Sequence, residues 1–229
     1  MLWGLFVGLV MGLGWVAYVR AVQVVPVSTA GVLYMTYPVF TLVIAWALFR
    51  DTPSWRAIVS ALMIVGAAAM VTTPGAVEAQ HIPALILSLA APAGFGLGIS
   101  VLVHRMGPIS VFARIGIVSI GSILGLLPLV LASDAAALFP AEPSGWWMVV
   151  GIGLATALVP QVIYTFCSPL VGTARTATAG SIELPVMFAV GWLAFGEALT
   201  PPQLLACAIV VTAIVITPAK RARSIAAEG

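Results

Sequence analysis

The residues best suited to chemistry lie in SIELPVMFAVGWLAFGEALTP, residues 181–201. Glu183 is followed two residues later by Pro185, in a stretch whose other residues are nearly all apolar or small. Pro185 has no N–H, so the carbonyl of Ser181 loses its helical partner and the helix can bend around Glu183. A carboxylate at such a bend is a candidate ligand or proton site. Two other interpretations stay open: Glu183 hydrogen-bonds hydroxyls such as that of Thr178, or it lies close enough to an interface to stay wet.

Polar residues also occur in two pairs whose members are three positions apart and lie beside a proline. Residues with this spacing share one face of a helix, and polar groups on one face of a membrane helix normally point into the bundle. Lining of a cavity and plain hydrogen bonding between helices explain these pairs equally well. The pairs are Tyr34 and Tyr37 before Pro38, and Gln161 and Tyr164 after Pro160; with Pro185, these prolines are the expected helix breaks.

The composition places these residues in a membrane. Of the 229 residues, 62% are hydrophobic and only 7% are charged, and the mean hydropathy is +1.18. So few charges cannot cover the surface of a soluble domain, whereas a chain surrounded by lipid needs charges only at its ends and loops. A transmembrane barrel would show alternating apolar and polar residues, and this pattern is absent from the sequence. The sequence therefore predicts an all-α integral membrane bundle.

Eight largely uncharged runs are long enough, or nearly long enough, to cross the hydrocarbon, which takes about 20 apolar residues in a helix. The third and the eighth are short for a span. The runs cover residues 2–19, 27–49, 57–73, 82–103, 110–132, 146–168, 177–195 and 202–217.

Basic residues sort to one side of this topology. With the amino terminus in the cytoplasm, only Arg20 falls outside, which is a strong bias under the positive-inside rule. Both termini are therefore expected in the cytoplasm. Arg114, at the start of the fifth span, either reaches inward as a counter-ion or extends to lipid phosphates. The cytoplasmic set is Arg50, Arg56, Arg105, Arg114, Arg175, Lys220, Arg221 and Arg223.

No sequence feature indicates an enzyme, a cofactor or a bound metal. The chain has no Walker sequence, no G-x-S-x-G and no H-E-x-x-H. His81 and His104 stand alone at opposite membrane faces in this topology, so we expect no metal site. Cys167 and Cys207 are expected to be small packing residues and not a disulfide. The scattered basic residues leave no face for nucleic acid, and membrane lipid is the expected surrounding.

One unit of the sequence occurs twice. Residues 35–53 read MTYPVFTLVIAWALFRDTP and residues 182–201 read IELPVMFAVGWLAFGEALTP. Each has Pro-Val, then a small residue with Trp, then Phe, then an acid (Asp51 or Glu197), then Thr-Pro. The topology puts Asp51 inside and Glu197 outside, so the two copies are expected to be inverted. Inverted repeats with helix breakers near mid-membrane are the architecture of secondary transporters.

These two stretches resemble the EamA-type branch of the drug/metabolite transporter superfamily, as does YVRAVQVVPVSTAG at residues 18–31. Members of that branch have two five-helix repeats, each with a Pro-Val-Phe-like helix that ends in a Gly-Glu element. The family often has a glutamate just before this proline, where this chain has Glu-Leu-Pro-Val. The resemblance implies a first, partial repeat of about three helices at residues 1–76, a second of about five helices at 77–219, and a basic cytoplasmic tail at 220–229. Against the usual ten helices, the first repeat lacks its first two.

The resemblance also implies a function and a place. Arg20 lies where the family's third helix borders the central cavity, which makes it a candidate for substrate or gating contact, and the multi-pass chain belongs in a bacterial inner or plasma membrane. We expect a secondary transporter, and specifically an exporter, of small organic solutes such as amino acids or related metabolites, working by alternating access. If transport is coupled, protons are the expected driver and Glu183 their carrier. The alternative is a truncated, non-transporting membrane protein or a helix-packing scaffold.

A stripe of glycines bears on these alternatives. Gly4, Gly8 and Gly12 are four residues apart on one helix face, which lets two membrane helices approach closely. The first repeat offers nothing to fill this face, so we expect a homodimer or an upstream extension to cover it. The other interpretation is that these glycines face lipid.

Overall fold

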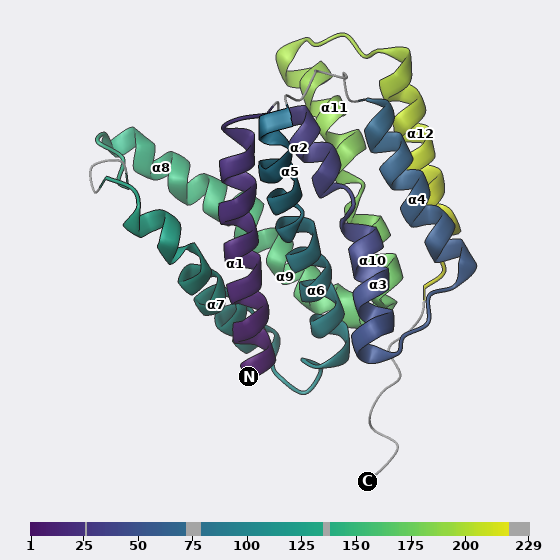
Figure 1. Cartoon of the computed structure of the whole chain (residues 1–229), viewed down its shortest axis with the longest axis horizontal. Helices are drawn as coiled ribbons and strands as arrows, with labels where there is room; N and C mark the ends of the chain where they lie inside the picture. The colour runs from purple at the N-terminus through teal and green to yellow at the C-terminus, as the bar shows by residue number, and fades with distance from the viewer. Residues whose placement is uncertain (26, 72–78, 135–137, 220–229) are drawn as a thin grey trace.

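The computed structural model describes residues 1–25, 27–71, 79–134 and 138–219, and every regular element in these ranges is a helix (Figure 1). The predicted all-α fold is therefore confirmed for the described part of the chain. The helices are α1 (Leu2–Val22), α2 (Val27–Tyr34), α3 (Tyr37–Phe49), α4 (Trp55–Met70), η1 (Ala79–His81), α5 (Ile82–Ser88), α6 (Ala90–His104), α7 (Val111–Leu131), α8 (Pro143–Ile152), the π-helical segment η3 (Gly153–Leu158), α9 (Val159–Val171), α10 (Thr173–Gly180), α11 (Glu183–Phe195) and α12 (Pro201–Ile216).

Six helical stretches in the described residues are long and apolar enough to cross a membrane. The two predicted spans that are short in the sequence, α4 and α12, have 16 residues each, which is roughly 24 Å of helix against a hydrocarbon core of about 30 Å. A multi-pass membrane protein is thus confirmed, whereas the count of eight spans stays a prediction. The six stretches are Leu2–Val22, Thr29–Phe49, Ile82–His104, Val111–Leu131, Pro143–Val171 and Thr173–Phe195.

The surface of the bundle suits a lipid surrounding. Large apolar side chains are exposed along the outer faces of α3, α8 and α11, among them Trp46, Trp147 and Leu193. An aqueous surface rarely carries so many exposed apolar side chains together.

Cys167 and Cys207 are both free thiols and form no disulfide with each other. The sequence suggested that both are packing residues, but Cys167 lies exposed on α9.

The glycine stripe of α1 packs against α7 of the same chain. A Cβ atom at Gly8 would lie 2.1 Å from the carbonyl oxygen of Val118, and one at Gly12 would lie 2.4 Å from that of Ser122. Backbone touches backbone here, which is the contact that small residues permit between membrane helices. The expectation that a homodimer or an upstream extension covers this face is therefore wrong, because the second half of the chain supplies the partner.

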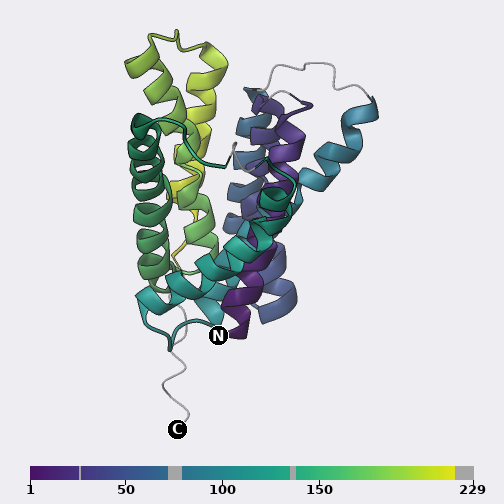
Figure 2. The ribbon, with the colours of Figure 1, turned by 90° about the vertical axis from the view of Figure 1, so that its left-hand side faces the viewer.

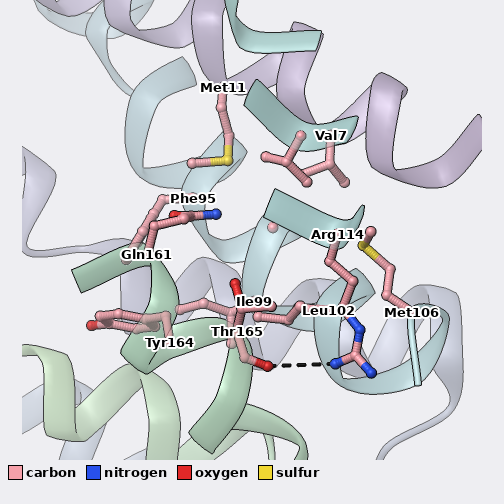
Figure 3. Close-up of a pocket in the computed structure, with 12 residues that line it drawn as sticks. Val7, Met11, Phe95, Ile99, Leu102, Met106, Arg114, Gln161, Tyr164 and Thr165 are labelled. Atoms are coloured by element: carbon pink, nitrogen blue, oxygen red, sulfur yellow. Dashed lines mark hydrogen bonds between the residues drawn. The ribbon is translucent and has the colours of Figure 1, made fainter. Parts of the chain in front are cut away.

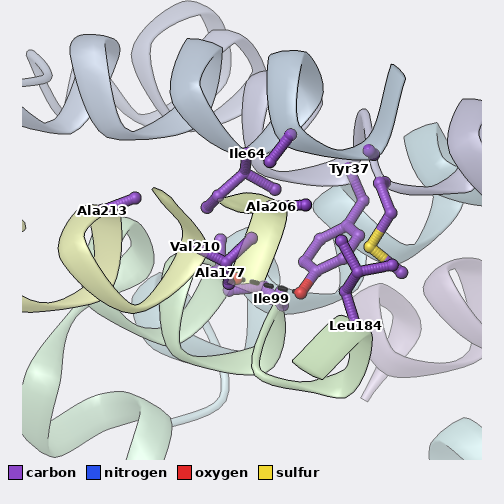
Figure 4. Packing of buried hydrophobic residues seen from close by; sticks show 11 residues of the cluster. Tyr37, Ile64, Ile99, Ala177, Leu184, Ala206, Val210 and Ala213 are labelled. Atoms are coloured by element: carbon purple, nitrogen blue, oxygen red, sulfur yellow. Dashed lines mark hydrogen bonds between the residues drawn. The ribbon is translucent and has the colours of Figure 1, made fainter. Parts of the chain in front are cut away.

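A second packing centre joins the two halves of the chain. Helices α4 and α12 lie side by side, and the buried faces of these helices meet α3, α6, α10 and α11 (Figures 1 and 4). Ile64 of α4 and Val210 of α12 are both fully buried in this cluster, together with Tyr37. In Figure 2, the purple-to-blue amino-terminal helices and the light green-to-yellow carboxy-terminal helices form two groups.

The repeated sequence unit folds in the same local way twice. Helices α3 and α11 are both 13 residues long, and each follows a two-residue break after a shorter helix. Each ends in a left-handed residue, Arg50 or Gly196, after which the N–H of Asp51 or Glu197 bonds to a carbonyl six residues back. Figure 1 shows α2–α3 and α10–α11 running in opposite directions. Inversion of the complete repeats stays a prediction, and their predicted boundary near residue 76 and the tail at 220–229 lie outside the described residues.

Polar contacts gather at the end of the bundle where α1 begins. Arg105 lies over the rings of Trp3 and Phe49, with its guanidinium carbon 5.9 and 5.8 Å from their centroids. Arg175 donates to the carbonyls of Ile214 and Thr217 at 2.7 and 2.5 Å, so it caps the carboxyl end of α12. Helix α12 thus ends toward the side on which α1 starts. Arg20 lies at the opposite end of α1.

Candidate functional site

All four tyrosines of the chain lie in one aromatic cluster. They come from four separate helical segments, and Trp15 and Phe95 join them to form a continuous set of ring contacts. Centroid separations within the set run from 5.0 Å, between Tyr37 and Phe95, to 6.1 Å, between Tyr34 and Phe95. The members are Trp15 and Tyr18 of α1, Tyr34 of α2, Tyr37 of α3, Phe95 of α6 and Tyr164 of α9.

The cluster has a buried base and an exposed edge. Tyr37 is 1% exposed, and its hydroxyl donates to the carbonyl of Ala177 at 3.0 Å (Figure 4) and lies 3.2 Å from the hydroxyl of Ser181. These contacts attach the base of the cluster to the break between α10 and α11. Trp15, at the other side, is 42% exposed. The cluster is therefore open at one edge and anchored at the other.

Gly180 makes room for two tyrosine hydroxyls. A Cβ atom at this position would lie 2.0 Å from the hydroxyl of Tyr164 and 2.7 Å from that of Tyr37. Any larger residue would have to displace one of these rings. The glycine at the end of α10 is thus a residue of the site, and its proximity to the tyrosines could not be inferred from sequence spacing.

Glu183 lies beside this cluster. It is the first residue of α11, and its carboxylate interacts electrostatically with Tyr18, Tyr34, Tyr37 and Tyr164. The structure thus brings together Glu183 and the three tyrosines that the sequence singled out, and adds Tyr18.

Among the described residues, neither an ion pair nor a hydrogen bond from Thr178 compensates this carboxylate. Within the described part of the chain, no arginine, lysine or histidine nitrogen lies within 4.0 Å of it. The hydroxyl of Thr178, an expected hydrogen-bond partner, donates instead to the carbonyls of Ala174 and Arg175. Glu183 itself is exposed on the surface of the bundle.

Two of the three prolines lie just after a break between helices, and the third lies in a helical stretch that continues through it. Pro38 is the second residue of α3, and Pro185 is the third of α11. Pro160 is the second residue of α9, directly after the π-helical segment η3, a distortion often found at functional sites. At the second break, the carbonyl of Ser181 accepts from Leu184 N at 3.2 Å, so a tighter turn replaces the helical bond that Pro185 cannot make.

A small cavity adjoins the aromatic cluster on the side toward α7 (Figure 3). Its volume is about 40 Å³, which is enough for water and too small for an organic solute. Phe95 and Tyr164 belong both to its wall and to the cluster, and Gln161 extends into it from α9. Gln161 therefore lines a cavity, one of its two expected positions. The remaining wall is mostly apolar and includes Val7, Met11, Ile99, Leu102, Met106 and Val118.

The polar end of this cavity is formed by Arg114 and Thr165. Arg114 is only 8% exposed, and it donates to the carbonyls of Ile109 at 2.6 Å, Gly107 at 2.7 Å and Thr165 at 3.4 Å. Arg114 therefore links the start of α7 to α9 through these hydrogen bonds. The structure shows neither of the two roles expected for it, which were a counter-ion to an acid and a contact with lipid phosphates. The Thr165 hydroxyl is buried without a hydrogen-bond partner in the described residues. Such a group is a ready donor for water or a solute.

Another polar contact joins the two halves at the end where α1 begins. Nε2 of His104 lies 3.4 Å from Oδ2 of Asp51, and Thr173 donates to the same oxygen at 3.0 Å. The His104 ring stacks on Phe49 with a centroid separation of 4.8 Å. The sequence suggested that His104 stands alone. The structure instead places it beside Asp51. Sequence spacing could not reveal this contact, because Asp51 and Thr173 are 122 positions apart.

Arg20 is not brought into the cluster. It is exposed near the end of α1, two positions after Tyr18, and residues with that spacing point to different faces of a helix. Its expected contact with substrate therefore stays a prediction without support from the geometry around Glu183.

Comparison with known proteins finds a match to a family over part of the chain and a relative over most of it. Residues 1–73 match the EamA-like transporter family. An uncharacterized transporter from Synechocystis sp. is 28% identical over 218 residues, which make up 91% of this chain and 64% of that protein. The chain thus spans a little less than two thirds of this relative's length.

A solved structure has the same fold. A crystal structure of a protein superposes with a TM-score of 0.77 at 16% sequence identity, over 94% of this chain and 75% of the other. At this identity the likeness concerns the arrangement of the helices alone.

Proposed function

Because residues 1–73 match the EamA-like transporter family, we propose that this chain is a secondary transporter of small organic solutes such as amino acids or related metabolites. The proposed direction is export, the proposed mechanism is alternating access, and the proposed place is a bacterial inner or plasma membrane with both termini in the cytoplasm. The transporter name of the Synechocystis relative supports the general class.

The observation that carries this proposal is the position of Glu183. An ionisable side chain in a membrane segment is costly, and it marks a solute or proton path by default. Here it begins the second half of a broken helix, interacts electrostatically with tyrosines from both halves of the chain, and has no protein cation within 4.0 Å among the described residues. Broken helices beside a central polar site are the usual arrangement in secondary transporters.

The small size of the adjoining cavity supports a change of conformation during transport. A space of about 40 Å³ cannot hold an amino acid, so helices must separate before a solute reaches the aromatic cluster from that side. The contact of Asp51 with His104 and Thr173 joins the two halves of the chain at the end where α1 begins. Its opening would be part of the proposed alternating access.

Transport by the purified chain in lipid vesicles tests the proposal. Uptake or efflux of radiolabelled amino acids should exceed that of protein-free vesicles, and a pH gradient should drive it if protons are coupled. Glu183→Gln keeps the shape of the side chain and cannot titrate, so it should abolish gradient-driven transport and preserve exchange without a gradient.

Other outcomes point elsewhere. Loss of both transport modes with an unchanged amount of folded protein would assign Glu183 to direct binding of an amine-bearing solute. Tolerance of Gln in both assays, with loss only in Glu183→Leu, would make the residue structural. Absence of transport for every solute tested would favour the alternative, a non-transporting scaffold.

A further inference from the structure

The contact of Asp51 with His104 and Thr173 joins the two halves of the chain through a titratable pair. We propose that His104 binds a proton when this end of the bundle closes and releases it when the end opens, with Asp51 as the acid that stabilises the protonated ring. This inference rests on the proposed function only for the step of transport, because the contact can be measured without any solute.

Both ring nitrogens of His104 face oxygen atoms. Nδ1 lies 2.9 Å from the carbonyl oxygen of Ser100, and Nε2 lies 3.4 Å from Oδ2 of Asp51. A carbonyl oxygen has no proton to donate, so Nδ1 must carry the hydrogen of that bond. A neutral imidazole has only one N–H, which would leave a lone pair on Nε2 facing the carboxylate. The arrangement therefore fits the doubly protonated, cationic ring.

The other neighbours of this pair favour the same form. The hydroxyl of Thr173 donates to Oδ2 of Asp51 at 3.0 Å, so this oxygen already acts as an acceptor. The His104 ring lies flat on Phe49, with a centroid separation of 4.8 Å and an interplanar angle of 4°. The face of an aromatic ring attracts a cation. A carboxylate and a ring face thus both stabilise a proton on His104.

The position of the pair couples this proton to the two halves of the chain. Asp51 follows α3 in the first half, whereas His104 ends α6 and Thr173 begins α10 in the second. Loss of the proton would remove the attraction and leave two acceptors facing each other. The side chains of His104 and Asp51 are 24% and 19% exposed, so water can reach them to exchange the proton. Histidine ordinarily changes its charge between pH 5 and 8.

Asp51 is the acid that compensates a charge on His104. Within the described part of the chain, no second acid lies within 4.0 Å of this ring. The charged groups on neighbouring elements at this end are otherwise positive, and they oppose a proton on His104. The titratable groups there are the amine of Met1 before α1, Arg50 after α3, Arg56 on α4, Arg105 after α6, Arg114 on α7, the thiol of Cys167 on α9 and Arg175 on α10.

The distance between the two halves at this end, measured at two pH values, tests the proposal. Thr52 and Leu170 are exposed, so Thr52→Cys and Leu170→Cys can carry spin labels once Cys167 and Cys207 are replaced by serine. Double electron–electron resonance of the full chain in lipid should show a ratio of short to long distances about 2- to 5-fold higher at pH 5.5 than at pH 8, as expected for a partly exposed ion pair. The same distance distribution at both pH values would overturn the proposal.

Variants at position 104 separate the charge of the ring from its shape. His104→Gln cannot titrate, so its distance distribution should not depend on pH. His104→Arg is charged at both pH values and should keep the high ratio of short distances at both. His81→Gln removes the other histidine of the chain, and this matched control should respond to pH as the unaltered chain does. A pH response retained in His104→Gln would refute the role of this ring.

Thermal unfolding gives a second readout that needs no labels. Between pH 8 and pH 5.5, the unfolding temperature of the unaltered chain should rise relative to that of His104→Gln, because the folded state gains the ion pair. An equal response of the two chains would contradict the proposal. A pH-dependent distance in a chain that transports no solute would refute the proposed function and leave this inference intact; transport by a chain whose distance ignores pH would do the reverse.

Discussion

Replacement of Gly8 by alanine tests the central packing of the fold. The added methyl group would lie 2.1 Å from the carbonyl oxygen of Val118 and 2.8 Å from Cα of Gly121. An ordinary contact needs about 3.4 Å, so α1 and α7 would have to separate by about 1.3 Å, the difference between 3.4 and 2.1 Å. The three atoms nearest the methyl group all belong to the backbone, so rotation of a side chain does not relieve the overlap.

The expected cost follows from two opposing effects. Overpacking costs about 1–3 kcal/mol, and a site enclosed by backbone belongs at the upper end of that range. Alanine regains about 1 kcal/mol over glycine through its greater helix propensity, so the net loss of stability should be about 2 kcal/mol.

Thermal unfolding in detergent measures this loss, and Gly116→Ala on α7 is the matched control. A Cβ atom at Gly116 meets nothing within 4 Å, so this variant should unfold at the same or a higher temperature than the unaltered chain. Gly8→Ala should unfold at a lower one and remain of unchanged size in gel filtration. A Gly8→Ala variant as stable as Gly116→Ala would show that α1 does not pack on α7 through this face.

Three further predictions concern the helix ends, the site and the topology. Arg50 is the one described non-glycine residue in the left-handed region, with φ 54°, so Arg50→Gly should stabilise the chain by about 1 kcal/mol in the same unfolding assay, and a loss of stability would contradict the strain. Gly180→Ala should displace the Tyr164 ring and lower solute transport in vesicles with little loss of thermal stability; normal transport would argue against the tyrosine arrangement. A reporter active only outside the cytoplasm should be silent when fused after residue 225 and active after residue 138, and activity at the carboxyl terminus would overturn the proposed topology.

Much of the candidate site was predictable because its signals are local. Glu183, Pro185 and the prolines beside the tyrosines stand out in an apolar sequence, since a charge or a missing N–H has few tolerable positions in a membrane helix. The structure has helix breaks just before Pro38 and Pro185, with Glu183 at the second, whereas the helix continues through Pro160. The participation of Tyr18 and Gly180 gave no such signal, because an isolated tyrosine or glycine in a membrane helix is unremarkable by itself.

The sequence alone determined the class of the protein and the course of its helices. Apolar runs of about 20 residues must form helices in a bilayer, because no water is present to satisfy the backbone. Pro38 and Pro185 lie next to interruptions of these helices, whereas Pro128 and Pro169 lie inside helices that continue. The similar local ends of α3 and α11, at Arg50 and Gly196, likewise follow from two related stretches of sequence.

Only the tertiary structure decided which faces meet. The glycine stripe of α1 indicated a close partner, and nothing local identified that partner as α7, more than 100 positions later in the chain. The same holds for the contact of Asp51 with His104 and Thr173, and for the burial of Arg114 against carbonyls. Helix formation depends on neighbours along the chain, whereas the pairing of faces depends on how all the helices fill space together.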